Sequence, residues 1–315
     1  MNRLQQFVLS LFAAPRLNMR EDYGKVRRAQ RWVASISMPW RRTPYRQTLV
    51  RLGDRSISVR VFQPQQRTRD DVLVFFHGGG WVTGDIETYT PACANMAELT
   101  GCAVASVNYR LAPEHPFPAG LNDCYGVAQQ VLANPLAAGI DRAENIVLIG
   151  DSAGGNLAAA TSLLLKERGQ RAFSRQILLY PVTHWDHDPE TSPFDSVREY
   201  GEGLRLTNTE IDDYFDLYVP EPMEQRGPLV SPLMADDLSG QPTTLILTAE
   251  QDLLRDEGEA YGQAIAAADG TAEVHRIPSA LHGFIQLPKF SKPMREAYEH
   301  INAFLDAHPA PKVGA

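Results

Sequence analysis

The hydrophobic residues of this chain form short runs separated by longer amphipathic stretches. Ser56–Phe62 alternates apolar and polar residues, which is typical of a half-buried edge strand. Runs rich in Val, Ile and Leu predict strands covered on both faces: Val72–Phe76, Ala103–Tyr109, Ile146–Ile149, Ile177–Tyr180, Thr243–Thr248 and, later, Ala272–Ile277. Between and after them the pattern predicts helices at Pro118–Asn134, Gly155–Arg168, Asp256–Ala268 and Pro293–Ala307.

This alternation of strands and helices predicts an α/β fold with a mostly parallel, doubly wound sheet. Two stretches interrupt it, residues 1–46 ahead of the first strand and residues 184–227 after the strand ending at Tyr180. A structureless loop as long as the second stretch is unusual, so we expect helices there, including one at Thr207–Val219. We therefore expect one main domain, residues 47–183 and 228–315. We expect residues 1–46 and 184–227 to join over the carboxyl ends of the strands, where such folds bind ligands.

Charge and composition narrow the function classes. The net charge of −8 argues against general nucleic-acid binding. Residues 1–60 carry 13 Lys and Arg against 3 Asp and Glu, or +10, which leaves −18 for the remainder. We interpret the basic segment as a solvated helix surface and expect no stable membrane association, although a basic amphipathic segment could also approach anionic lipids.

The possible targeting signals are weak. The apolar stretch Phe7–Ala14 is too short to span a bilayer, and the charged segment before it is thin for a signal peptide. Cys93, Cys102 and Cys124 form neither a zinc pattern nor an even disulfide framework. We interpret them as reduced thiols and expect a cytoplasmic protein.

Two glycine-rich motifs follow predicted buried strands. Gly150–Gly155 has the pattern G-x-S-x-G, a sharp strand-to-helix turn that exposes the hydroxyl of Ser152. Taken alone, it could be a tight turn whose serine caps the next helix. His77–Trp81 has the HGGG pattern of loops that present backbone N–H groups to an oxyanion. Together the motifs predict acyl transfer with Ser152 as the nucleophile, which needs a base.

His282 is the best candidate for that base. It follows the strand ending at Ile277 by a few residues, in a loop that would project its side chain over the carboxyl end of the sheet. Other histidines are expected in a strand, in the last helix and tail, or shaping the glycine loop: His275, His300, His308 and His77.

The orienting acid is expected between the serine and the histidine in the chain. Asp252 follows the strand Thr243–Thr248 and would accept the imidazole Nδ1–H, while Glu250 is its nearest competitor. Asp256 and Glu257 are better explained as acids in the first turn of a helix. The expected oxyanion donors are the backbone N–H groups of Gly79, Gly80 and Ala153.

At these residues the chain resembles the hormone-sensitive-lipase-like family of α/β-hydrolase esterases, also called bacterial family IV. The resemblance includes the two glycine motifs, Tyr109–Ala119, Ser231–Leu233 and Ala249–Gly258. It implies an α/β-hydrolase fold with a helical cap, the triad Ser152, Asp252 and His282, and Gly79, Gly80 and Ala153 as oxyanion donors. Leu253 stands where this family often has proline, with little expected consequence. Glu114 and His115 are expected to be structural.

The predicted function is hydrolysis of small-molecule carboxylic esters with short or medium acyl chains, without a metal or organic cofactor. The cluster His184–Asp188 is interpreted as a solvated cap loop rather than a metal site. Aromatic and apolar residues could line the substrate pocket or form the core of the cap: Trp81, Trp185, Tyr200, Leu206 and Phe215, together with Phe194 and Tyr214.

Two alternatives stay open. Related hydrolases cleave formamides, so an amidase or formamidase is compatible with the motifs. The plant gibberellin receptors resemble this family and bind a ligand without hydrolysing it, but they depart at the triad histidine, which is present here as His282. The sequence does not determine the oligomeric state, and a homodimer is compatible with it.

Overall fold

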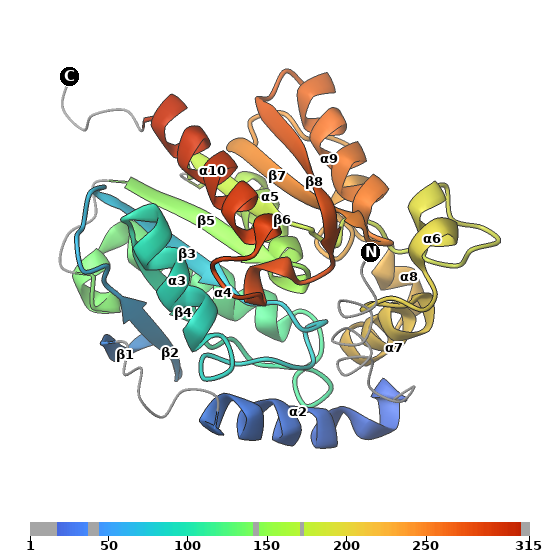
Figure 1. Ribbon diagram of the computed structural model, residues 1–315, viewed down its shortest axis with the longest axis horizontal. Helices are drawn as coiled ribbons and strands as arrows, with labels where there is room; N and C mark the ends of the chain where they lie inside the picture. The colour runs from blue at the N-terminus through green and yellow to red at the C-terminus, as the bar shows by residue number, and fades with distance from the viewer. Residues whose placement is uncertain (1–17, 37–43, 141–144, 171–172, 310–315) are drawn as a thin grey trace.

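The computed structural model describes residues 18–36, 44–140, 145–170 and 173–309, and its centre is an eight-stranded sheet (Figure 1). The strand order is β1-β2-β4-β3-β5-β6-β7-β8. β2 pairs antiparallel with β1 and β4, and the other neighbours are parallel. The strands are β1 Tyr45–Leu52, β2 Arg55–Phe62, β3 Asp71–Phe76, β4 Ala103–Val107, β5 Asn145–Asp151, β6 Arg175–Leu179, β7 Thr243–Gln251 and β8 Ala272–Leu281.

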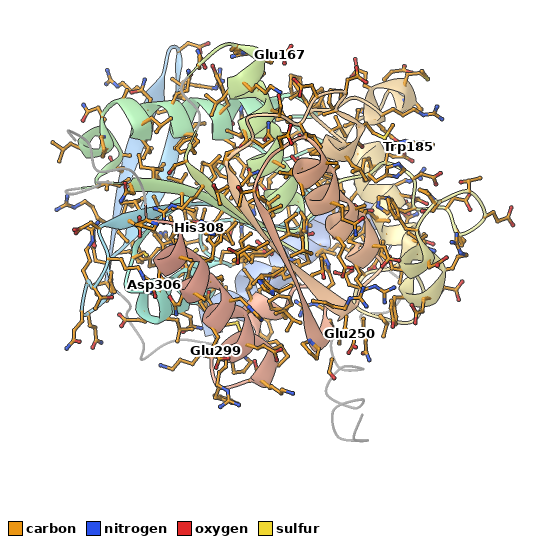
Figure 2. All side chains as sticks on the ribbon, turned by 90° about the horizontal axis from the view of Figure 1, so that it is seen from above. Glu167, Trp185, Glu250, Glu299, Asp306 and His308 are labelled. Atoms are coloured by element: carbon orange, nitrogen blue, oxygen red, sulfur yellow. The ribbon has the colours of Figure 1, made fainter. Side chains whose placement is uncertain are left out.

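Helices cover both faces of the sheet. They do so because successive residues of the central strands point to opposite faces and are apolar on both. In β3, Val72 and Val74 belong to one buried cluster, and Leu73 and Phe75 to the other. α3 (Thr90–Thr100) and α10 (Lys292–Ala307) pack on one face. α4 (Ala119–Ala133), α5 (Ala153–Glu167) and α9 (Arg255–Ala267) pack on the other. In Figure 2 the labelled residues of α10 and Glu167 of α5 lie on opposite sides of the sheet.

The structure confirms the predicted doubly wound sheet and corrects its edge. Residues Ser56–Phe62 form β2, but β1 lies outside it and is the edge strand. β1 escaped prediction because most of its side chains, including Leu49, are exposed and show no apolar alternation. The pattern also missed α3, whose buried positions are nearly continuous rather than confined to one stripe.

A second group of helices lies outside the sheet, with α6, α7 and α8 at the right of Figure 1 and α2 along its lower side. It comprises α2 (Met19–Ile36) and three helices inserted between β6 and β7: α6 (Asp195–Tyr200), α7 (Asn208–Tyr218) and α8 (Pro222–Gln225). The helix predicted at Thr207–Val219 is α7, which begins with a reciprocal capping box between Thr207 and Glu210.

Ion pairs join α2 to α7. Arg20 Nε lies 2.6 Å from Asp213 Oδ1, and its Nη2 lies 2.5 Å from Asp216 Oδ2. The backbone N–H of Met19 donates to Asp213 Oδ2 at 3.1 Å. The basic N-terminal helix therefore contacts an acidic inserted helix. The stretch Phe7–Ala14 lies outside the described residues. Among the residues that the structure describes, no helix is long and apolar enough to cross a membrane.

Candidate active site

Ser152 lies in a tight turn between β5 and α5. Its φ of 55° is a left-handed conformation that is strained for a residue with a Cβ. A Cβ on Gly150 would lie 2.1 Å from the backbone oxygen of Gly154, and one on Gly154 would lie 2.0 Å from that of Phe76. Only glycines therefore let α5 begin this close to β3 and β5.

A chain of two hydrogen bonds links Ser152 to a histidine and an aspartate. His282 Nε2 lies 2.9 Å from Ser152 Oγ, and His282 Nδ1 lies 2.7 Å from Asp252 Oδ2. The three residues follow β5, β7 and β8, whose carboxyl ends meet at one edge of the sheet. Glu250, the competing acid, instead accepts the backbone N–H of Ser279 at 2.6 Å. The geometry suits proton transfer from the serine to a histidine whose orientation a buried carboxylate holds.

The loop after β3 is fixed by side chains from outside it. His77 is buried, stacks on Tyr109 with ring centroids 4.3 Å apart, and lies with Nδ1 2.8 Å from the oxygen of Gly78. Tyr109 donates to the backbone oxygen of His77 at 2.6 Å. Burial lowers the pKa of His77 to about 4, so its ring is neutral at pH 7 and shapes the loop. This agrees with the expectation that His77 shapes the glycine loop.

Three backbone N–H groups of the two glycine-rich loops are among those that have no protein acceptor within the described part of the chain. They belong to Gly79 and Gly80 in the loop after β3 and to Ala153, the first residue of α5. β3 and β5 are adjacent, with Phe76 paired to Gly150, so both loops begin at the same level of the sheet. Free N–H groups beside a nucleophilic serine are suited to bind an oxyanion.

Asp151 connects the two loops from behind. Its side chain accepts the N–H of Gly78 at 2.7 Å and the hydroxyls of Tyr89 at 3.1 Å and Tyr180 at 3.4 Å. Burial is the largest effect on this group and raises the pKa of Asp151 to about 6. No role for Asp151 was predicted from the sequence, although its position directly before Ser152 is a signal for one.

Comparisons with known proteins agree with this geometry. The family model of the alpha/beta hydrolase fold matches residues 73–286. An arylesterase of Saccharolobus solfataricus is 34% identical over 77% of this chain and 78% of its own length. The carboxylesterase NlhH of Mycobacterium tuberculosis is 36% identical over 74% of this chain and 72% of its own length. This chain belongs to the hormone-sensitive-lipase-like α/β hydrolases.

The similarity to solved structures extends over nearly the whole chain. A hyperthermophilic esterase from the archaeon Pyrobaculum calidifontis has a TM-score of 0.86 and 32% sequence identity, and the match covers 98% of each chain. Because the match spans both the sheet and the inserted helices, the whole described architecture is shared with that esterase. The expected α/β-hydrolase fold is confirmed.

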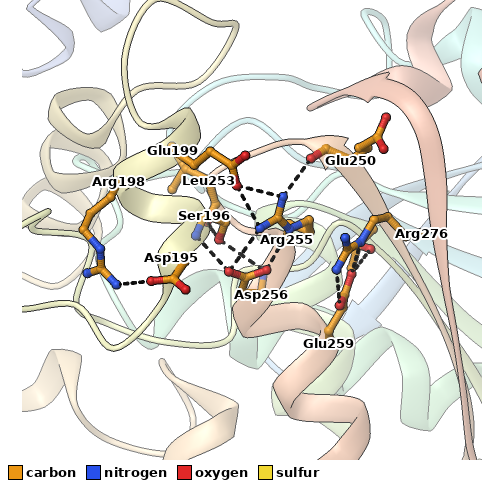
Figure 3. Close-up of polar contacts among 11 residues, drawn as sticks. Asp195, Ser196, Arg198, Glu199, Glu250, Leu253, Arg255, Asp256, Glu259 and Arg276 are labelled. Carbon is orange, nitrogen blue, oxygen red and sulfur yellow. Dashed lines mark hydrogen bonds and ion pairs between the residues drawn. The ribbon is translucent and has the colours of Figure 1, made fainter.

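The loop that carries Asp252 is attached to the inserted helix α6 (Figure 3). Ser196 Oγ donates to the backbone oxygen of Leu253 at 2.7 Å, and the Ser196 N–H donates to Asp256 Oδ2 at 2.8 Å. Arg255 bonds Glu199 of α6 as well as its neighbour Asp256. Asp256 does lie in the first turn of α9, as predicted, but it also anchors α6 to the hydrolase sheet.

The residues predicted for a substrate pocket fall into two groups. Trp81 and Phe215 are almost fully buried and contact each other with ring centroids 5.2 Å apart, and Leu206 is also buried. Trp185 and Tyr200 are partly exposed, each under a guanidinium, that of Arg226 for Trp185 and that of Arg255 for Tyr200. Figure 2 shows Trp185 among the inserted helices.

The segment 184–188 differs from the expected solvated loop. His187 is 1% exposed and its Nε2 lies 2.8 Å from Glu257 Oε2, while Glu257 also accepts the N–H of Thr183 at 2.6 Å. A buried imidazole beside a buried carboxylate is a structural pair that fastens the start of the insertion to α9. Within the described residues no group of three or more His, Cys, Asp or Glu side chains is arranged to hold a metal ion.

Proposed function

We propose that Ser152, His282 and Asp252 are the nucleophile, base and orienting acid of a carboxylesterase whose oxyanion donors are the N–H groups of Gly79, Gly80 and Ala153. The protein is a carboxylic ester hydrolase, as its esterase relatives indicate. The observation that carries the proposal is the unbroken contact from Ser152 Oγ through His282 to Asp252. That contact is the arrangement that activates a serine hydroxyl at neutral pH.

In acylation, Ser152 Oγ attacks the ester carbonyl carbon while its proton passes to His282 Nε2. The buried Asp252 carboxylate accepts the Nδ1–H and stabilises the imidazolium that forms. The carbonyl oxygen becomes an oxyanion and accepts hydrogen bonds from the free N–H groups of the two loops. When the tetrahedral intermediate collapses, the C–O bond to the alcohol breaks and His282 returns its proton to the departing alkoxide.

In deacylation, water replaces the alcohol. His282 Nε2 accepts a proton from the water as its oxygen attacks the acyl carbon, and a second tetrahedral oxyanion forms. Its collapse breaks the bond to Ser152 Oγ, which regains the proton from His282 as the carboxylic acid leaves. Every proton is carried by one histidine, so the cycle needs no further group from the protein.

We further propose that α2 and the insertion 184–227 form a cap that favours acyl chains shorter than about ten carbons, because such a cap limits the space beside the serine. The ion pairs of Arg20 with Asp213 and Asp216 support a single cap made from both segments. Turnover of p-nitrophenyl esters from acetate to palmitate measures this preference. Faster turnover of emulsified long-chain triglycerides than of soluble butyrate esters would contradict it.

Covalent labelling tests the proposed nucleophile. We expect a p-nitrophenyl phosphonate ester to modify Ser152 stoichiometrically, and Ser152→Ala to abolish both labelling and butyrate hydrolysis. Ser162→Ala is a matched control, because Ser162 also belongs to this region, on α5. Its hydroxyl forms one described hydrogen bond, to the side chain of Gln176. A folded wild-type protein that stays unlabelled at Ser152 would overturn the esterase mechanism and favour a ligand-binding role. Faster cleavage of an anilide than of the ester with the same acyl group would favour the amidase alternative.

We also propose a cytoplasmic location. The support is the state of the cysteines, since Cys93, Cys102 and Cys124 are all buried free thiols. Burial raises the pKa of Cys93 to about 12 and that of Cys102 to about 11, so both stay protonated and unreactive. Cell fractionation with an antibody to the chain tests this location.

A further inference from the structure

One aromatic side chain of α7 lies directly on the loop that follows β3. A Cβ built on Gly80 would lie 2.2 Å from Tyr214 Cγ and 2.4 and 2.5 Å from its two Cδ atoms. Such distances from three ring atoms mean that the Tyr214 ring covers the Cα of Gly80. Gly80 has a φ of 59°, so its backbone conformation also favours glycine. A residue without a side chain is therefore needed here both for conformation and for contact with Tyr214.

The hydroxyl end of Tyr214 reaches the same loop a few residues later. It interacts with the side chain of Thr83. Thr83 closes the turn, because its backbone N–H and its Oγ1 both donate to the oxygen of Gly79, at 2.8 and 3.0 Å. Tyr214 thus contacts the turn at two points after Gly79, at Gly80 with its ring and at Thr83 with its hydroxyl.

The next turn of α7 continues the contact. Tyr218 stacks on Trp81 with ring centroids 4.4 Å apart and ring planes 6° from parallel. The backbone oxygen of Tyr218 accepts the N–H of Phe117, which ties α7 to the hydrolase domain at 2.8 Å. Since residues four apart share one face of a helix, Tyr214 and Tyr218 present one aromatic surface to residues 80 and 81.

We propose that Tyr214 is a positioning residue for the oxyanion donors, a role that rests on the function proposed above. The ring and hydroxyl hold the turn 79–83 so that the N–H groups of Gly79 and Gly80 stay aimed at the developing oxyanion. Oxyanion stabilisation depends on donors placed before the reaction, so a small displacement of the turn lowers turnover more than it lowers ground-state binding. The insertion then controls the chemical step as well as access to the serine.

The competing interpretation is that Tyr214 only lines the substrate pocket. That role would change KM and the acyl-chain preference and leave the use of the oxyanion donors intact. A pair of substrates with the same acyl and alcohol groups separates the two roles, one an ester and the other its thionoester with C=S in place of C=O. Sulfur is larger and a weaker hydrogen-bond acceptor than oxygen, so the ester-to-thionoester ratio of kcat/KM reports the oxyanion contacts.

We expect Tyr214→Ala to lower kcat for the ester toward the roughly 10²–10³-fold loss that follows removal of one oxyanion donor. KM should change by less than about threefold, because the donors act chiefly in the transition state. The ester-to-thionoester ratio should fall with kcat. Tyr214→Phe keeps the ring on Gly80 and loses only the contact with Thr83, so its kcat and ratio should lie between those of wild type and Tyr214→Ala.

Tyr125→Ala is the matched control, because Tyr125 is a buried tyrosine of α4 whose hydroxyl bonds Gln170. It should lower the melting temperature and leave the substrate ratio at the wild-type value. If Tyr214→Ala does not fold, Tyr214→Phe and Tyr214→Leu provide the same comparison with less lost volume. A wild-type ratio with a raised KM in the folded variants would overturn the positioning role and leave the esterase mechanism standing. Absence of phosphonate labelling in the wild type would overturn both.

Discussion

The two glycine-rich loops of the site are constrained in different ways. In the turn around Ser152, the close contacts are between backbone atoms, those of Gly150 with Gly154 and of Gly154 with Phe76. In the loop after β3, Gly79 lies against the backbone of Thr83 in the same loop, but Gly80 lies against a side chain of a distant segment, the Tyr214 ring of α7. The first loop is therefore built by the sheet and its next helix. The second depends on the inserted helices and α2, and it can change without disturbing the sheet.

The largest effect should follow a change in the first loop. The Cβ of Gly154→Ala would lie 2.0 Å from the backbone oxygen of Phe76 in β3, an atom that cannot move without disturbing the sheet. We expect a loss of at least about 3 kcal/mol in the free energy of unfolding, measured by urea denaturation, together with loss of phosphonate labelling.

Gly169→Ala provides the control for that change. Unlike Gly154, Gly169 has a positive φ, and no atom lies within 4 Å of the position its Cβ would take. Only backbone strain of about 1–2 kcal/mol should result. Equal destabilisation by the two substitutions would mean that the contact with Phe76 costs no more than backbone strain alone.

A change in the second loop should act on turnover more than on folding. The Cβ of Gly80→Ala would meet the Tyr214 ring, a side chain that can shift. We expect kcat to fall by at least about 10²-fold, because displacement of the turn removes oxyanion contacts. The free energy of unfolding should fall by about 1–3 kcal/mol, from backbone strain and crowding.

A double-mutant cycle makes this comparison sharper. Gly80→Ala combined with Tyr214→Ala removes the clash, so the two losses in kcat should not add. Additive losses measured across the cycle would mean that the ring and the glycine act independently and that the loop does not depend on α7 at this point.

The same contrast explains what could be predicted from the sequence. Ser152, Asp252 and His282 could be chosen because each follows an apolar strand, and parallel strands bring their carboxyl ends together. The glycines of the first loop could also be assigned a role, since their contacts involve residues close by in the chain or in the adjacent strand.

The partners of the second loop could not be predicted in this way. The pattern predicted α7, but a helical period does not say which distant glycine a tyrosine will cover. The contact between Tyr214 and Gly80 joins segments with no shared periodicity, and so does the contact between His187 and Glu257. The burial of His187 was not predicted because the acidic composition of segment 184–188 is typical of a solvated loop. β1 was missed for the opposite reason, because an exposed edge strand needs no apolar pattern.

Asp151 joins the two loops, so its substitution tests whether they respond together. Its pKa is raised from 3.8 to about 6 by burial. The folded protein therefore binds the proton more tightly than the unfolded chain, and this group lowers stability as the pH rises from about 4 through 6. Asp151→Asn should keep the acceptor for the Gly78 N–H and remove the buried charge.

Relative to wild type, Asp151→Asn should gain about 3 kcal/mol in the free energy of unfolding between pH 4 and pH 7, from a shift of about two pKa units. Urea denaturation of both proteins at the two pH values measures the difference, and groups common to both cancel. A difference that does not vary with pH would mean that the carboxyl titrates normally. The kcat at pH 7 should change by only a few-fold if an amide oxygen holds Gly78 as well as a carboxylate does.

The smallest effect should come from α2, whose Arg27 reaches the second loop closest to its glycines, while Gln30 and Arg31 contact Gly84 and Asp85 further along. Arg27 Nε donates to the oxygen of Val82 at 2.6 Å, its Nη2 donates to the oxygen of Ala112 at 2.6 Å, and its Nη1 pairs with Glu114 at 2.8 Å. A lysine cannot reproduce this fork of donors, so Arg27→Lys should behave nearly like Arg27→Ala. We expect both to lower the free energy of unfolding by about 1–2 kcal/mol.

We also expect both Arg27 variants to lower kcat several-fold, because Val82 follows the oxyanion glycines and donates its own N–H to Gly79. Lys25→Ala is the control on the same helix, since Lys25 is exposed and pairs only with Asp22 among the contacts described. It should change neither quantity, as exposed pairs contribute little. If Arg27→Ala loses stability but keeps full kcat, Arg27 stabilises the fold and does not shape the turn 79–83.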